Sequence, residues 1–115
     1  MHEIRFYKDE KGNSPVKDFL NELDSKQAIK VTWGLNLIEE HKNIPRTYFK
    51  KMVNTNGIWE VRIQSGNNIY RLMCFRFTNK IIVLTNGFHK KSQKTPHNEI
   101  ILAEKRKADW LRRFK

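Results

Sequence analysis

Cysteine is almost absent from the sequence, which contains one in 115 residues. A single cysteine cannot form an internal disulfide or supply the paired Cys-x-x-Cys motifs of a zinc site. Cys74 lies between Met73 and Phe75 in an apolar run, so we expect a buried thiol that packs as a small hydrophobic side chain. One cysteine also fits the reducing conditions of the cytoplasm.

Long apolar runs are missing as well. No run approaches the roughly 20 residues that a helix needs to span a bilayer, and residues 1–8 lack the apolar segment of a signal peptide. We therefore expect a cytoplasmic protein without a membrane partner. Residues 1–115 are enough for one hydrophobic core, so we expect a single domain.

The sequence lacks the common motifs for nucleotides and metals, because G-x-x-x-x-G-K-[ST], G-x-G-x-x-G and H-E-x-x-H are all absent. Its four histidines are scattered, and the glutamates after residue 40 are Glu60, Glu99 and Glu104. A two-metal nuclease needs acidic side chains that converge, so this class is disfavoured. We expect no cofactor and no metal site, and any strand cleavage should be metal-independent.

Acidic residues are scarce in the second half of the chain. Residues 1–60 contain 10 Lys and Arg against 9 Asp and Glu, whereas residues 61–115 contain 13 against 3. Nearly all of the formal net charge of +11 therefore belongs to the C-terminal half. This asymmetry favours a polyanionic partner, with nucleic acid as the first candidate and an acidic protein as the second.

The first half of the chain predicts a strand followed by a helical hairpin. Ile4 and Phe6 alternate with other residues, which indicates a short strand with one buried face that joins the later sheet. Ser14 followed by proline is a typical helix start, and Asp24 opens a second helix over residues 26–41. The apolar face of this second helix is predicted at Ile29, Trp33, Leu37 and Ile38.

The second half predicts a meander and a basic helix. Residues 43–56 are interpreted as a loop with at most a short turn. Residues 57–90 contain three runs rich in β-branched and aromatic residues, separated by the turn signals SGNN and TNK. Thr95 and Pro96 begin a last helix, with an apolar stripe predicted at Ile100, Ala103, Ala108, Leu111 and Phe114. The expected fold class is α+β: an N-terminal strand, a helical hairpin, a three-stranded antiparallel meander forming one small sheet, and a basic C-terminal helix.

Two arginines within the meander are candidate site residues. If the first turn is centred on Gly66 and Asn67, Arg62 lies opposite Arg71. Like charges in this position destabilise a sheet by a few tenths to about 1 kcal/mol, so the fold has little structural reason to place them there. A bound phosphate would relieve the conflict, because two guanidinium groups can bond to it together. On this hypothesis, either arginine can be removed with little loss of stability.

The end of the third strand adds further candidates. Phe88, His89, Lys90 and Lys91 are consecutive, and Lys94 follows three residues later. Histidine is the residue type best suited to transfer protons near neutral pH, so His89 is a candidate base. The alternative is a surface histidine, with the lysines stabilising the charge that develops in the reaction.

A second basic segment places Lys50 and Lys51 next to Tyr48 and Phe49. Basic and aromatic residues alternate in this way where bases stack while phosphates are neutralised. For the aromatic pair we favour the alternative, burial under a loop. For the two lysines both interpretations remain open.

RNA would allow these residues to act without a metal. Its 2′-hydroxyl is an internal nucleophile placed beside the scissile phosphate. The protein then needs to align it, remove its proton, stabilise charge on the phosphate and protonate the leaving 5′-oxygen. Arginines, lysines and one histidine can do this.

Three segments of the sequence carry a resemblance: IWEVRI at residues 58–63, NIYRLMCF at residues 68–75 and GFHKKSQKTP at residues 87–96. On these segments the chain resembles the HigB branch of the RelE/ParE toxin superfamily, in its phage-derived-protein-like form. The order of the predicted elements agrees as well. The resemblance therefore covers essentially the whole chain and implies a RelE-like fold.

The resemblance implies the toxin of a type II toxin–antitoxin system, which cleaves mRNA in the ribosomal A site and is paired with a cognate helix-turn-helix antitoxin. It implies that Arg62 and Arg71 hold the phosphate and that residues 88–91 stack on a base or move protons, while the acid and the base stay open. An alternative, from the ParE branch, is non-catalytic inhibition of DNA gyrase. The candidate catalytic residues are Arg62, Arg71, His89, Lys90 and Lys91, and the candidate RNA contacts are Lys50, Lys51, Phe88 and Lys94.

Overall fold

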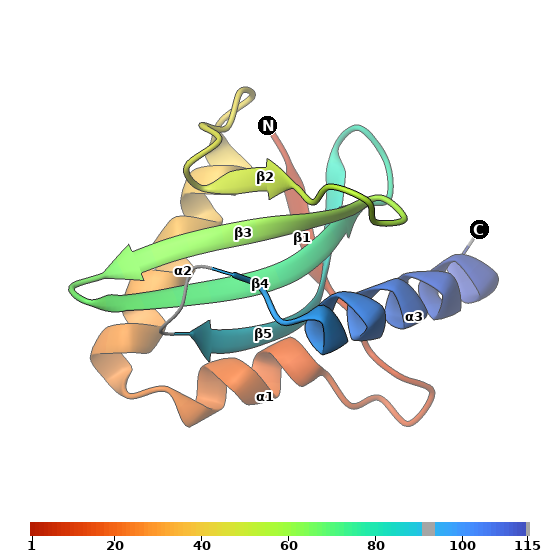
Figure 1. The fold of residues 1–115 in the computed structure, drawn as a ribbon, viewed down its shortest axis with the longest axis horizontal. Helices are drawn as coiled ribbons and strands as arrows, with labels where there is room; N and C mark the ends of the chain where they lie inside the picture. Colours follow the sequence, from red (N-terminus) through yellow and green to blue (C-terminus); the bar gives the residue numbers. More distant parts are fainter. Residues whose placement is uncertain (91–93, 115) are drawn as a thin grey trace.

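The computed structural model describes residues 1–90 and 94–114 of the chain. These described residues form five strands and three helices in an α+β arrangement (Figure 1). In chain order the elements are β1 (Glu3–Phe6), α1 (Pro15–Glu22), α2 (Ser25–Glu40), β2 (Phe49–Lys51), β3 (Ile58–Ser65), β4 (Asn68–Arg76), β5 (Ile81–Lys90) and α3 (His97–Phe114). None of the helices within the described ranges combines the length and the apolar character needed to cross a membrane.

The predicted meander is confirmed, but the sheet is larger than predicted. Its strand order is β1-β5-β4-β3-β2, with β1 parallel to β5 and the other pairs antiparallel. β2 was expected to be loop, because a strand of three residues is too short to show an alternating pattern. It is stabilised by Phe49, whose ring stacks on Trp59 with the centroids 4.5 Å apart.

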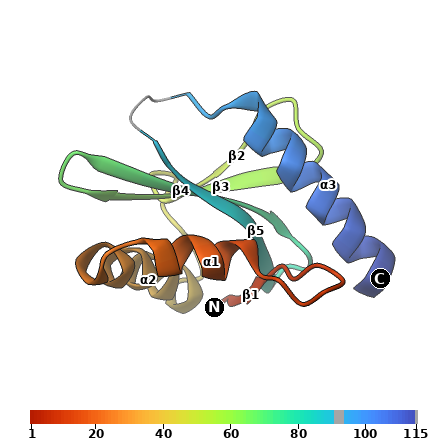
Figure 2. The same cartoon turned by 90° about the horizontal axis from the view of Figure 1, so that it is seen from below.

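Helices cover both faces of the sheet. Figure 2 shows α1 and α2 on one side and α3 on the other. We call the first side the hairpin face, and its buried core includes Val61, Ile63, Tyr70, Leu72 and Cys74. We call the second side the α3 face, where residues of the meander pack with α3, among them Ile58, Met73 and Phe88. Neighbouring residues of one strand point to opposite faces.

Both helices of the hairpin begin at the predicted caps. The Oγ of Ser14 accepts a hydrogen bond from the N–H of Lys17 at 3.4 Å, and Pro15 is the first helical residue. Asp24 and Gln27 form a capping box, in which each side chain accepts the backbone N–H of the other. These local signals therefore determine where each helix of the hairpin begins.

The buried face of α2 differs from the prediction. Ile29 is 69% exposed and Trp33 is 46% exposed. Gly34 explains the difference, because a Cβ at this position would lie 2.5 Å from Cδ1 of Ile63. The helix approaches β3 at its glycine, and Trp33 is turned away from the core. The residues of α2 that are buried are Val31, Gly34, Leu35 and Ile38.

The stripe predicted for α3 is also partly wrong. Ala103 is buried as expected, but Ala108 and Phe114 are exposed. Trp110 is buried in their place, seven residues or two helical turns after Ala103. It packs in a cluster with Tyr7, Phe75 and Val83.

Candidate functional site

The register of the β3–β4 hairpin is the predicted one. Ser65 pairs with Asn68 across a two-residue turn, in which Gly66 has a φ of 60° that favours glycine. Arg62 consequently lies opposite Arg71. Both side chains belong to the α3 face.

Glu60 lies beside both arginines, and sequence reasoning missed this contact. Its Oε1 is 2.9 Å from Nη1 of Arg71 and 3.5 Å from Nε of Arg62. The side chains of Arg71 and Glu60 are 2% and 3% exposed, while that of Arg62 is 33% exposed. The carboxylate compensates the facing charges, so the fold itself has a reason to keep both arginines. The expectation that the fold has little structural reason to place the two arginines opposite each other is therefore wrong.

The strand pattern contained a signal for this contact. Residues 60 and 62 share a face because side chains alternate along a strand. Glu60 pairs with Met73, which makes it a diagonal neighbour of Arg71. Long side chains reach across such diagonal positions, so the predicted register was sufficient to find the ion pair.

Thr95 completes a buried network around Glu60. Its hydroxyl donates a hydrogen bond to Oε2 of Glu60, and the residue is itself buried. The carboxylate thus binds Arg71 with one oxygen and the segment before α3 with the other. Among the described residues, Nε and Nη2 of Arg71 have no hydrogen-bond partner. Of the three charged side chains in this network, that of Arg62 is the one that solvent reaches.

Three other predicted residues lie on or beside the α3 face. Phe88 pairs with Arg71 and is half-buried. Lys50 of β2 faces the same way and is partly exposed. Lys94 is exposed and directly precedes Thr95. We call the following set the basic face: Lys50, Arg62, Arg71, Phe88 and Lys94.

His89 lies on the hairpin face. It pairs with Tyr70, and the two rings stack with their centroids 5.1 Å apart. Its Nε2 is 2.9 Å from Oδ1 of Asn68. Because Tyr70 belongs to the hairpin-face core, the sheet separates His89 from Arg62 and Arg71. The structure does not bring the histidine together with the arginines.

The remaining candidates are three lysines. Lys51 pairs with Trp59 and is exposed on the hairpin side of β2. Lys90 is the last residue of β5, where its backbone pairs with Ile69. Lys91 lies outside the described residues.

Cys74 is not a candidate nucleophile. It is fully buried, and burial raises the pKa of its thiol far above the ordinary value. Within the part of the chain that the structure describes, no three His, Cys, Asp or Glu side chains are grouped to hold a metal ion.

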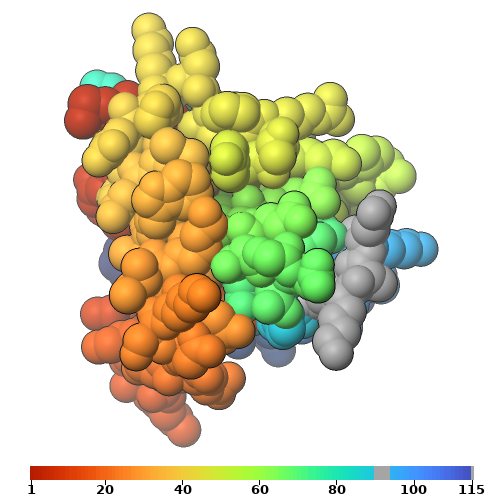
Figure 3. Space-filling model, turned by 90° about the vertical axis from the view of Figure 1, so that its left-hand side faces the viewer, coloured from red at the N-terminus to blue at the C-terminus, as the bar shows by residue number. Residues whose placement is uncertain are grey.

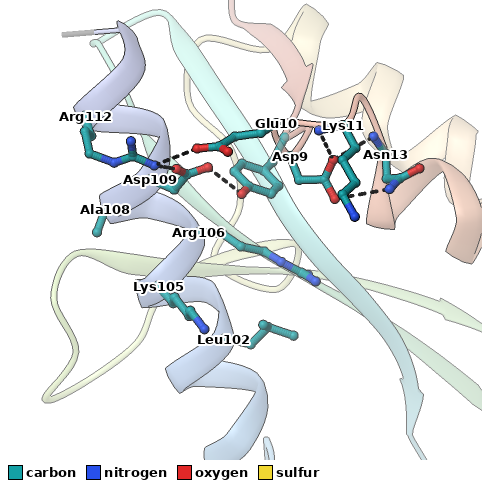
Figure 4. Close-up of a pocket in the computed structure, with 11 residues that line it drawn as sticks. Asp9, Glu10, Lys11, Asn13, Leu102, Lys105, Arg106, Ala108, Asp109 and Arg112 are labelled. Atoms are coloured by element: carbon teal, nitrogen blue, oxygen red, sulfur yellow. Dashed lines mark hydrogen bonds and ion pairs between the residues drawn. The ribbon is translucent and has the colours of Figure 1, made fainter.

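A groove of about 790 Å³ separates α3 from the loop between β1 and α1 (Figure 4). Asp109 accepts a hydrogen bond from the hydroxyl of Tyr7 at 2.6 Å, and this bond lowers the pKa of the Asp109 carboxyl. The same carboxylate pairs with Arg113 at 2.8 Å, and Arg112 connects it to Glu10. The Tyr7–Asp109 hydrogen bond and the Arg112–Glu10 ion pair connect α3 to the N-terminal segment, so we interpret the groove as a structural contact between them.

The profile of one protein family matches most of the chain. Residues 18–108 match the family described as phage derived protein Gp49-like (DUF891). The chain belongs to this family, which is associated with RelE-like toxins of toxin–antitoxin systems. The matched span includes the whole meander and the Glu60–Arg71 pair. A search of curated proteins finds no relative that matches the sequence.

Proposed function

We propose that the chain is the toxin of a type II toxin–antitoxin system and cleaves mRNA in the ribosomal A site. The family supports the toxin class. The observation that carries the proposed activity is the exposure and position of the Arg62 side chain. It reaches solvent, and it lies on the sheet beside the buried Glu60–Arg71 pair. An accessible guanidinium on a rigid sheet is suited to bind a phosphate and to stabilise the charge that develops on it.

The other residues of the basic face have supporting roles in this proposal. Arg71 is a positioning residue, because its charge is taken up by the carboxylate that also contacts Arg62. The half-buried ring of Phe88 offers a surface for a base. Lys50 and Lys94 neutralise flanking phosphates.

The proposed reaction uses the nucleophile of the RNA. The 2′-hydroxyl loses its proton and attacks the adjacent phosphorus, and the bond from phosphorus to the 5′-oxygen of the next nucleotide breaks. That oxygen takes up a proton as it leaves. We keep Lys90 and Lys91 as candidates for the proton transfers. His89 is less favoured than the two lysines, because it lies on the hairpin face.

We further propose a helix-turn-helix antitoxin as partner, with an acidic segment that covers the basic face. The family association supports an antitoxin, and the net charge of +11 favours an acidic contact. Association should slow as salt concentration rises, because salt screens the attraction between the two surfaces. An association rate that does not change with salt would argue against capture by charge.

Single-turnover cleavage of mRNA on programmed ribosomes tests the activity. We expect Arg62→Ala to lower the cleavage rate on the order of 10²-fold or more, the usual effect of losing one such electrostatic contact. The matched control is Arg76→Ala, which removes the same charge from β4. The guanidinium of Arg76 lies over the rings of Phe49 and Trp59, which belong to the hairpin-face cluster.

The control variant should cleave at the rate of the wild type. Equal rates for the two arginine variants would overturn the assignment of Arg62. Intact mRNA with an inhibited DNA gyrase would overturn the nuclease proposal in favour of the ParE-like alternative.

A further inference from the structure

Trp33 is a large aromatic residue that the packing of α2 leaves exposed to solvent. The sequence pattern predicts it in the core, yet 46% of it is exposed on α2. The other two tryptophans are packed, since Trp59 stacks on Phe49 and Trp110 is buried. Trp33 instead meets the ring of Tyr48 edge to face, with the centroids 6.4 Å apart.

These two rings line a hollow of about 290 Å³ at the edge of the sheet. β2 pairs with β3 as far as Val61, and the backbone N–H of Arg62 donates to the carbonyl of Tyr48 at 2.9 Å. Beyond Arg62 the edge of β3 is not covered by β2. Figure 3 faces this side, where the orange surface of α2 adjoins the green surface of the β3–β4 hairpin. Arg62 and Gln64 of β3 also line the hollow, together with Lys30 of α2.

The lining has the chemistry of a nucleotide site. It combines two aromatic rings with the cations Lys30 and Arg62, and none of the described residues that line it is acidic. Aromatic side chains stack on bases of any sequence, while cations bind the phosphates between them. A protein docking site built on exposed apolar area would not need two cations directed at the same hollow.

We propose that this hollow binds one nucleotide of a single-stranded RNA, with its base stacked on the ring of Trp33 beside Tyr48 and its phosphate bound by Arg62 and Lys30. The inference rests on the proposed function, because it adds a second contact for the same substrate. Arg62 belongs both to the hollow and to the basic face. The phosphate of the bound nucleotide is therefore the one that Arg62 binds in the proposed reaction.

Lys30 must move for the base to enter. Its Nζ lies 4.0 Å from the centre of the Trp33 ring, so the ammonium group covers one face of that ring. Such a cation–π contact is weak where solvent reaches it, and the flexible lysine can exchange the ring for a phosphate. The hollow thus contains both the stacking surface and the charge that binding requires.

The test is the affinity of the full chain for a single-stranded 2′-O-methyl RNA hexamer, which binds but cannot be cleaved. Binding is followed by the polarisation of a labelled hexamer and by the quenching of tryptophan fluorescence. We expect Trp33→Ala to weaken binding about ten- to hundredfold, the usual effect of losing one stacked base, and Trp33→Phe to retain most of the affinity without the quenching. The control is Ile29→Ala, which removes a more exposed side chain from the same helix outside the hollow.

Each outcome separates this inference from the proposed function. Equal affinities for Trp33→Ala and Ile29→Ala would overturn the nucleotide site, and so would equal binding of a duplex of the same length, because charge alone would explain it. Cleavage that depends on Arg62 would then still support the nuclease. Conversely, binding that depends on Trp33 in a protein that does not cleave mRNA on ribosomes would support the hollow and overturn the nuclease.

Discussion

The two faces of the sheet differ in construction, although they alternate residue by residue along the same strands. On the hairpin face, Leu72 and its neighbours form an apolar core under α1 and α2. On the α3 face, the adjacent residue Arg71 is equally buried but charged, and Glu60 balances it. Buried ion pairs contribute little net stability, because desolvation offsets their attraction. We infer that apolar packing on both faces stabilises the fold, while the ion pair of the α3 face is retained to position Arg62.

The largest expected effect is the loss of stability in Arg71→Ala. Removing one partner of a buried ion pair leaves the other charge uncompensated, which costs about 3–5 kcal/mol. Denaturant unfolding followed by circular dichroism measures this cost. A loss of unfolding free energy below about 1 kcal/mol would mean that Glu60 reaches solvent in the variant. The α3 face would then not differ from the hairpin face by a buried ion pair. This expectation replaces the one from the sequence, in which Arg71 was dispensable for stability.

The matched control replaces both partners with apolar residues. We expect the double variant Glu60→Leu, Arg71→Met to recover most of the stability lost in Arg71→Ala, because no buried charge remains. It should nevertheless cleave mRNA on the order of 10²-fold more slowly, since Arg62 loses the carboxylate that orients it. A stable double variant with the activity of the wild type would show that the ion pair has no role in positioning Arg62.

A smaller effect is expected where polar groups attach α3 to the N-terminal segment. The hydrogen bond from Tyr7 lowers the pKa of Asp109 in the folded state. The resulting stability is fully present above the ordinary pKa of a carboxyl group and is lost as pH falls through the lowered one. The difference in unfolding free energy between wild type and Asp109→Asn should therefore be constant near neutral pH and shrink in strong acid. A difference that persists unchanged in acid would contradict the stabilising role assigned to the hydrogen bond between Tyr7 and the ionised Asp109.

The smallest effect is expected for His89→Gln. The histidine lies on the hairpin face and stacks on Tyr70, so single-turnover cleavage should stay within about twofold of the wild type, the range of an ordinary surface substitution. Its pH profile should also be unchanged. A large loss of rate with an altered pH profile would show that His89 reaches the substrate, and would mean that the sheet does not separate the two sets of residues.

Local signals in the sequence predicted the parts of the fold that depend on neighbouring residues. The caps at Ser14 and Asp24 were found because they act within one helical turn. The pairing of Arg62 with Arg71 was found because a two-residue turn determines the register of a hairpin. The α+β class and the order of the main elements followed from these signals.

Features that depend on packing between distant segments were missed. The outward position of Trp33 follows from the close approach of Gly34 to Ile63, which no pattern within α2 reveals. β2 forms because Phe49 stacks on a residue of β3. Strand alternation could have predicted that the candidate residues are divided between the two faces. Adjacent residues such as Phe88 and His89 point in opposite directions.

The most direct measurement is a map of mRNA 5′ ends in cells after brief induction of the wild type, Arg62→Ala and Arg76→Ala at matched expression. Our account predicts new ends within translated codons for the wild type and for Arg76→Ala, and their loss in Arg62→Ala. New ends at the same positions in Arg62→Ala, or intact mRNA in all three strains, would contradict the claim that the basic face is the site of mRNA cleavage.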